Sequence, residues 1–231
     1  MIPESSRRAM LGGFALAGIG CFVGSVLALH RLQPGLDPLD QAVSYYVHGP
    51  HGWLLTVGLI GLGLGSLALT VGVTPTEHGP RMRAGRGFLG LWSVCVLLAG
   101  IFAADPPGHW DQPPSTSGMI HGAVAMTALF LALPLAAWLL SRSFRNDLRW
   151  HWLSGLSFTL AVAMLASLIA FAISLAPVFV TDGPPRLLGL TERILLAVNS
   201  AWLCVLAFGL LRVGAKGTSG ESSSQTLAGS R

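Results

Sequence analysis

Charged residues are scarce in this sequence. Asp, Glu, Lys and Arg make up 10% of its 231 residues, whereas a soluble domain contains about 25% of them. This scarcity excludes an ordinary soluble domain, and the 52% of hydrophobic residues indicates a membrane protein with several spans. A net charge of +4 would suggest nucleic-acid binding in a soluble protein. Here the basic residues stand between long apolar runs, as is typical of membrane topology, so no nucleic-acid partner is expected.

Cysteine is also rare. The three cysteines, Cys21, Cys95 and Cys204, all lie inside apolar runs. An odd number of scattered, intramembrane cysteines forms neither a disulfide framework nor a zinc motif. The His-Glu-x-x-His motif of zinc metalloproteases is absent as well. The cysteines are therefore expected to pack as small apolar side chains.

Six apolar runs are each long enough to cross a membrane, since a span needs about 20 apolar residues to cross about 30 Å of hydrocarbon. No charged residue lies in the middle third of any run. The sequence therefore predicts an all-α fold, a polytopic membrane helix bundle with six transmembrane helices. The predicted spans are 10–29, 53–73, 87–104, 118–140, 152–176 and 191–211.

The basic residues alternate between the two sides of these spans, and one side receives only Arg31, Arg186 and Arg193. By the positive-inside rule the richer side is cytoplasmic, so both termini are expected in the cytoplasm and the protein in a bacterial inner membrane. The expected segments are a cytoplasmic N-terminus (1–9), a membrane domain (10–212) and a Gly/Ser-rich, disordered cytoplasmic tail (213–231). The basic residues of the richer side are Arg7, Arg8, Arg81, Arg83, Arg86, Arg142, Arg145, Arg149, Arg212, Lys216 and Arg231.

Small residues recur at helical spacing in three of the runs, and such stripes are predicted to face neighbouring helices, because small residues let backbones approach closely in lipid. His121 precedes the stripe of the fourth run by one turn and is therefore expected to point into the bundle. The stripes are Gly13, Ala17, Gly20, Gly24 and Ala28 in the first run, Gly58, Gly61, Gly65, Ala68 and Gly72 in the second, and Ala125, Ala128, Ala132 and Ala136 in the fourth.

Polar and titratable residues gather in the predicted outer connections and at the span ends beside them. Asp105 ends the third span, His121 begins the fourth, and Glu192 and Arg193 begin the sixth. Because these positions share one depth in the membrane, their side chains are expected to meet, and a titratable residue at this depth is a functional candidate. The predicted polar cluster, a candidate ligand-binding site, is Asp37, Ser44, Asp105, His121, Glu192 and Arg193.

Five segments carry a family resemblance: PGLDPLDQAVSYY after the first run, RMRAGRGFLGLW entering the third, LLAGIFAADPPG leaving it, SGMIHGAVAMTALF starting the fourth and LLGLTERILL starting the sixth. In order and spacing they resemble DUF998, a family of bacterial and archaeal membrane proteins with about six spans. The resemblance covers about residues 10–212 and implies the topology above. It picks out the six residues of the polar cluster and supplies no reaction.

One interpretation gives the residues of the cluster a purely structural role. Asp105 and Arg193 are predicted to form an ion pair that joins the third and sixth spans. Glu192 is favoured near a helix N-terminus by the helix dipole. One of the hydroxyl residues 115–117 is predicted to cap the fourth span.

Two hydrolytic interpretations are open as well. In the first, a membrane-embedded, metal-dependent lipid hydrolase holds zinc with Asp105, His109 and His121 and uses Glu192 as general base. In the second, Ser44 is a nucleophile and His121 its base.

Haem held between His30 and His121, or by His78 and His151, is a further interpretation. A small transporter is another, although carriers usually place charges near the midplane, where this chain has none. The interpretation that the sequence favours is a non-enzymatic integral membrane protein of uncharacterised function, without a cofactor. It contacts the bilayer and either binds a small or lipid-like ligand through the polar cluster or only assembles with partners, and no oligomeric state is predicted.

Overall fold

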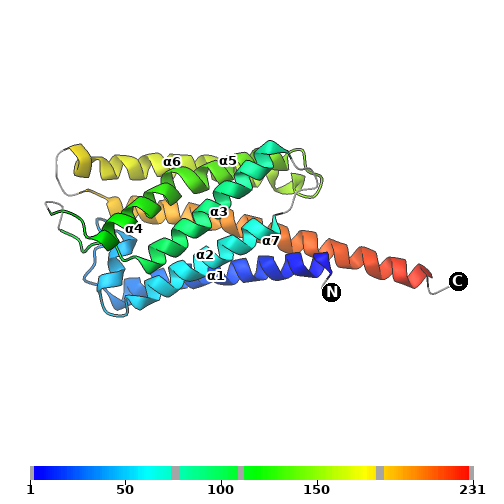
Figure 1. The fold of residues 1–231 in the computed structure, drawn as a ribbon, viewed down its shortest axis with the longest axis horizontal. Coiled ribbons are helices and arrows are strands. Elements are labelled where there is room, and N and C mark those ends of the chain that lie inside the picture. The colour runs from blue at the N-terminus through cyan, green and yellow to red at the C-terminus, as the bar shows by residue number, and fades with distance from the viewer. Residues whose placement is uncertain (1–2, 74–78, 109–111, 181–184, 229–231) are drawn as a thin grey trace.

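The computed structural model describes residues 3–73, 79–108, 112–180 and 185–228, with side chains described up to residue 215 except at position 179. This part of the chain folds into helices and contains no strand (Figure 1). The elements are α1 (Glu4–Leu32), the 3-10 helix η1 (Val43–His48), α2 (Trp53–Gly72), α3 (Pro80–Ile101), α4 (Thr116–Met126), the π-helix η2 (Thr127–Ala132), α5 (Leu133–Phe144), the 3-10 helix η3 (His151–Leu153), α6 (Ser154–Val180) and α7 (Leu188–Ala228).

Six helical stretches are long and apolar enough to cross a membrane, so the prediction of a six-span membrane protein is confirmed. Each overlaps one of the predicted spans, and α4, η2 and α5 together make the fourth. The candidate spans are Glu4–Leu32, Trp53–Gly72, Pro80–Ile101, Thr116–Phe144, His151–Val178 and Leu188–Ala215.

The six spans pack as a closed ring. Each span contacts the next one along the chain through α1, α2, α3, α5 and α6, and α7 packs against both α6 and α1. Figure 1 shows α1 and α2 on one side of the bundle, α5 and α6 on the other, and α3 and α7 between them. The centre of the bundle is therefore filled by side chains from several spans and not by a further helix.

Glycines set the distance between α1 and α2. A Cβ atom on Gly18 would collide with the carbonyl of Gly61, and one on Gly65 would lie 3.0 Å from the carbonyl oxygen of Ala15. The predicted stripes of α2 and α4 do face inward, but the prediction for the first span is wrong. Gly13, Gly20 and Gly24 face away from other helices, and the buried face is Gly12, Ala15, Gly18, Ile19, Phe22, Ser25 and Leu29.

The fourth span is not a uniform α-helix. The N–H of Leu133 donates to the carbonyl of Ala128, five residues back, so the turn before Pro134 is π-helical. Proline has no N–H and its ring crowds the preceding turn, which accounts for an irregular turn at this place. Single π-turns widen a helix and are frequent at functional sites.

Indole–hydroxyl hydrogen bonds tie the spans together inside the apolar core. The Trp92 indole of α3 donates to Ser66 of α2 at 3.1 Å. The Trp202 indole of α7 donates to Ser157 of α6 at 3.0 Å, and Ser157 is 2.6 Å from the hydroxyl of Ser141 in α5. In lipid such bonds contribute about 0.6 kcal/mol each, and here they join neighbours of the ring.

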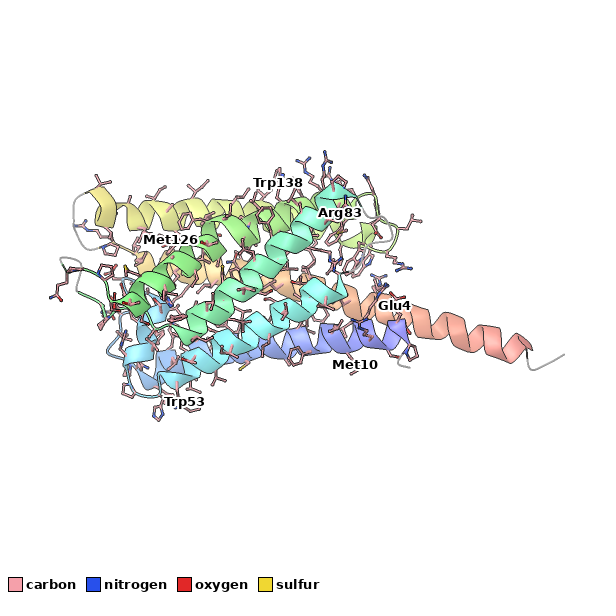
Figure 2. All side chains as sticks on the ribbon, in the orientation of Figure 1. Glu4, Met10, Trp53, Arg83, Met126 and Trp138 are labelled. Carbon is pink, nitrogen blue, oxygen red and sulfur yellow. The ribbon has the colours of Figure 1, made fainter. Side chains whose placement is uncertain are left out.

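The two ends of the bundle differ. One end, called here the η1 end, holds the connection with η1, the end of α3 and the beginnings of α4 and α7. Figure 2 shows Trp53 at this end, and Glu4 and Arg83 at the opposite end. Beyond the opposite end α7 continues to Ala228 and projects from the bundle (Figure 1), whereas the sequence predicts a disordered tail from residue 213.

Candidate functional site

The connection from α1 to α2 folds over the η1 end. The buried amide of Gln33 donates to the carbonyls of Tyr46 and Pro50, which closes the connection into a compact cap. Asp40 accepts from the N–H of Leu187 at 2.8 Å and thereby attaches this cap to the start of α7. Asp37 is exposed and accepts from the N–H of Leu39, so this member of the predicted cluster stabilises a local turn.

Asp105 holds the beginning of α4. Its two carboxylate oxygens accept hydrogen bonds from Ser115, one from the hydroxyl at 2.5 Å and one from the backbone N–H at 3.0 Å. The Ser115 hydroxyl accepts in turn from the N–H of Gly118 at 3.0 Å, which confirms the predicted N-cap. The predicted ion pair between Asp105 and Arg193 is wrong, because Asp105 finds its partners within its own connection.

Arg193 lies on the other side of the η1 end, where neutral groups surround its guanidinium. It donates to the ring nitrogen Nε2 of His30 at 2.9 Å, to the hydroxyl of Tyr46 at 3.1 Å, and to the carbonyls of Gln41 and Gly189 at 2.8 Å. These contacts join α1, the cap and α7. Arg193 is therefore a positioning residue for all three elements. Within the described residues no carboxylate hydrogen-bonds to its guanidinium, although the charge of the neighbouring Glu192 acts on it.

Three members of the predicted cluster line one cavity inside the ring, the inner cavity. Ser44 comes from η1, His121 from α4 and Glu192 from α7. The inner cavity has a volume of about 70 Å³, and a single water molecule needs about 10–15 Å³. Its remaining walls are apolar, including Phe22, Leu55, Leu62, Trp92, Ala125 and Leu129.

His121 has a defined orientation. Its Nδ1 lies 2.8 Å from the carbonyl oxygen of Phe102 and 3.2 Å from that of Ala99. Carbonyl oxygens can only accept, so Nδ1 carries a proton, and in the neutral imidazole Nε2 is the acceptor. The carbonyls belong to the last turn of α3, which has no further helical partners for them. The imidazole thus completes the end of α3 and keeps one basic nitrogen, an arrangement typical of acid–base and ligand-binding histidines.

Glu192 is anchored by the cap. Its Oε2 accepts from the N–H of Val43 at 2.7 Å, the first residue of η1. The Glu192 side chain also lines the inner cavity. An acceptor from α7 therefore sits in the same cavity as the serine of η1 and the histidine of α4.

A second hollow opens at the η1 end, the vestibule, with a volume of about 570 Å³. It shares Ser44 and His121 with the inner cavity and extends past Tyr45 and Asp105 to Ser115. Burial, helped by the charge of Glu192, raises the pKa of Tyr45 to about 12. The Tyr45 phenol therefore keeps its proton at a pH where an exposed tyrosine loses it.

The metal interpretation falls partly outside the described residues, because His109 is not described. Both oxygens of Asp105 are engaged by Ser115, and His121 uses Nδ1 for α3. In the described ranges no group of three or more His, Cys, Asp and Glu side chains could hold a metal ion. The zinc set of Asp105, His109 and His121 therefore gains no geometric support.

The first haem pair, His30 with His121, does not fit the structure. Nδ1 of His30 donates to the carbonyl of Val26 at 2.7 Å, and its Nε2 accepts from Arg193, so no ring nitrogen is left for iron. His151 lies in η3 at the opposite end of the bundle, and His78 lies outside the described residues.

Sequence reasoning missed the roles of Gln33 and Tyr46 in the cap and of Phe22 and Trp92 in the cavity wall. Gln33 directly follows the first helix, and its burial, at 5% exposed, is visible only in the structure. No sequence signal distinguishes Phe22 and Trp92 from other apolar residues of the spans.

Comparison with known proteins gives one match. A family model described as "Protein of unknown function (DUF998)" matches residues 16–209. No curated protein and no solved structure matches the chain. The matched residues run from the first half of α1 to α7 and contain the inner cavity and the vestibule.

Proposed function

The chain belongs to the DUF998 family, and we propose that this multi-pass membrane protein binds a lipid-like amphiphile at the η1 end. The observation that carries the proposal is the pair of hollows that meet at Ser44 and His121. One is small and apolar, the other larger and open, so together they match a ligand with an apolar end and a polar end.

The apolar end of the ligand occupies the inner cavity. Transfer of apolar surface from water contributes about 25 cal/mol per Å², and the side chains of Phe22, Leu62 and Leu129 provide apolar contacts there. The π-helical turn supports this assignment, because Ala128 and Leu129 of that turn form part of the wall. The small side chain of Ala128 and the widened π-helical turn together leave room for the inner cavity.

The polar end of the ligand occupies the vestibule. Ser44 provides a hydroxyl and His121 an acceptor nitrogen at the boundary between the two hollows. Ligand sites are usually apolar hollows with a few converging polar groups, and this arrangement follows that pattern. With the arginine-rich side in the cytoplasm, the vestibule faces outward from a bacterial inner membrane.

Binding of a lysophospholipid to delipidated protein, followed by native mass spectrometry, tests the proposal. Ala125 lines the inner cavity and Ala123 is exposed on the same helix. Ala125→Leu should weaken binding by about tenfold through overpacking of about 1.4 kcal/mol. The matched control Ala123→Leu should bind like wild type. Equal binding by wild type and Ala125→Leu, or no binding by either, would contradict the proposal.

A second candidate is hydrolysis of a lipid ester, which the common cavity of Ser44, His121 and Glu192 favours. In this reaction Ser44 Oγ attacks the ester carbonyl, and Nε2 of His121 accepts its proton and passes it to the departing alkoxide. Water then releases the fatty acid and regenerates the serine. Release of fatty acid from phospholipid vesicles should be lost in Ser44→Ala and retained in Ser117→Ala. A wild-type protein that releases none excludes this candidate.

A further inference from the structure

A third hollow lies on the outside of the bundle, between α1 and α7, and is called here the lateral groove. It has a volume of about 250 Å³. Val23 and Leu27 of α1 and Ala197 of α7 line it and are exposed, Leu27 to 63%. Exposed apolar side chains on a spanning helix face lipid tails, so this hollow opens toward the bilayer.

The lateral groove and the inner cavity share part of their walls. Phe22, Val43 and Leu196 line both hollows, one from each side. Phe22 is 3% exposed and Val43 is also 3% exposed, so the partition is closed in this conformation. A rotamer change of a buried side chain is a small movement compared with the separation of two packed helices.

The end of the lateral groove that lies at the η1 end of the bundle carries a cation. His30 and Arg193 line it where α1 ends and α7 begins. From there to Val23 and Ser200 the groove follows about two turns of each helix, roughly 10 Å. The hydrogen-bond acceptors around Arg193 are neutral, and Glu192, the preceding residue, directs its Oε2 to the N–H of Val43. A cation at one end of an apolar groove is arranged to bind a phosphate group while the attached acyl chain lies along the groove.

We propose that the ligand of the inner cavity is a phospholipid that arrives from the bilayer, with one acyl chain passing from the lateral groove past Phe22 into the cavity. This inference rests on the proposed amphiphile site and names its substrate class and its route. Arg193 attracts the phosphate at the start of this route, and the partition of Phe22, Val43 and Leu196 moves aside for the ligand. The polar part of the ligand then comes to lie in the vestibule, which also admits water.

The groove can be blocked without touching the inner cavity. Ala197 lines the groove only and is exposed, so Ala197→Trp fills the groove from the lipid face. Val23→Trp blocks it independently from α1. Ala170 is exposed on α6, which lines neither hollow, and Ala170→Trp is the matched control.

The test uses full-length protein in vesicles of phosphatidylcholine and phosphatidylglycerol in equal amounts, with a phosphatidylglycerol probe that carries a photoreactive diazirine in one acyl chain. After irradiation, labelled peptides are identified by mass spectrometry. Wild type and Ala170→Trp should be labelled at the cavity wall formed by Ala125 and Leu129. In Ala197→Trp and Val23→Trp this labelling should appear about tenfold more slowly, which corresponds to a barrier higher by about 1.4 kcal/mol.

A second probe, a water-soluble photoreactive lysophospholipid added from outside, separates the two proposals. If both probes label the cavity wall equally in wild type and in both blocked variants, the ligand arrives through the vestibule and the lateral route is wrong, while the amphiphile site stands. If neither probe labels the cavity wall of wild type, the amphiphile site itself is wrong.

Discussion

Removal of the Asp105 carboxylate changes how α4 is held at the η1 end. Asp105 is half-buried and accepts two hydrogen bonds from Ser115, at 2.5 and 3.0 Å. Hydrogen bonds to a charged group contribute about 1.5–3 kcal/mol when they are buried. Because Ser115 is exposed, solvent reduces this contribution, while Ser115 itself still caps α4 in the variant. We expect Asp105→Ala to lower the free energy of unfolding by about 1–2 kcal/mol.

A pair of double-mutant cycles distinguishes the observed contacts from the ion pair that the sequence suggests. Asp105→Ala combined with Ser115→Ala should show a coupling energy of about 1 kcal/mol, because the two residues share their hydrogen bonds. Asp105→Ala combined with Arg193→Lys should be additive, because these residues have no common partner.

The free energies are measured by equilibrium unfolding in mixed micelles, followed by tryptophan fluorescence. A larger coupling of Asp105 to Arg193 than to Ser115 would refute the reasoning, since it would mean that the two ends of the cluster contact each other directly.

Three further predictions concern the bundle and the vestibule. Gly18→Ala should destabilise the bundle by about 1–3 kcal/mol, because its Cβ would collide with a carbonyl of α2, while Gly20→Ala, with open space around it, should have little effect in the same unfolding assay. Ser66→Ala and Trp92→Phe should show a coupling energy of about 0.6 kcal/mol in a double-mutant cycle. Burial and the charge of Glu192 raise the pKa of Tyr45 from 10.0 to about 12, so the folded protein keeps this proton at a pH where the unfolded chain loses it. Stability should therefore fall as the pH rises from 10.0 to about 12, and Tyr45→Phe should flatten that part of a plot of unfolding free energy against pH.

The six spans were predictable from the sequence because the length and hydropathy of a span are local properties. The meeting of Ser44, His121 and Glu192 followed from topology alone, since alternate connections of a bundle lie at the same end. His121 was predictable in more detail. It lies one turn before the inward-facing alanines of its span, so its direction follows from the helical period.

The packing face of α1 was not predictable in this way. Gly13, Gly20 and Gly24 form one small-residue stripe, and Gly12, Ala15 and Gly18 belong to another face of the same helix. Both stripes satisfy helical spacing, and the choice between them depends on which face meets α2 and α7. That choice is a property of the assembled ring and not of the helix.

The partners of Asp105 and Arg193 were not predictable for a related reason. Opposite charges at one depth suggest an ion pair, but a carboxylate can also be satisfied by a nearby helix N-terminus. Ser115 provides that alternative within the same connection, and the guanidinium of Arg193 is satisfied by neutral acceptors from the cap and α1. Local hydrogen bonds of Asp105 and long-range hydrogen bonds of Arg193 to neutral groups thus take the place of the predicted ion pair.

The measurement that tests the central claim most directly is an experimental density map of the protein in lipid nanodiscs. We expect elongated density that begins in the vestibule, passes between Ser44 and His121 and ends in the inner cavity near Trp92. Density should weaken in the cavity of Ala125→Leu and persist in Ala123→Leu. Isolated water peaks in the cavity of the wild-type protein, with no continuous density across Ser44 and His121, would contradict the claim that these hollows form one amphiphile site.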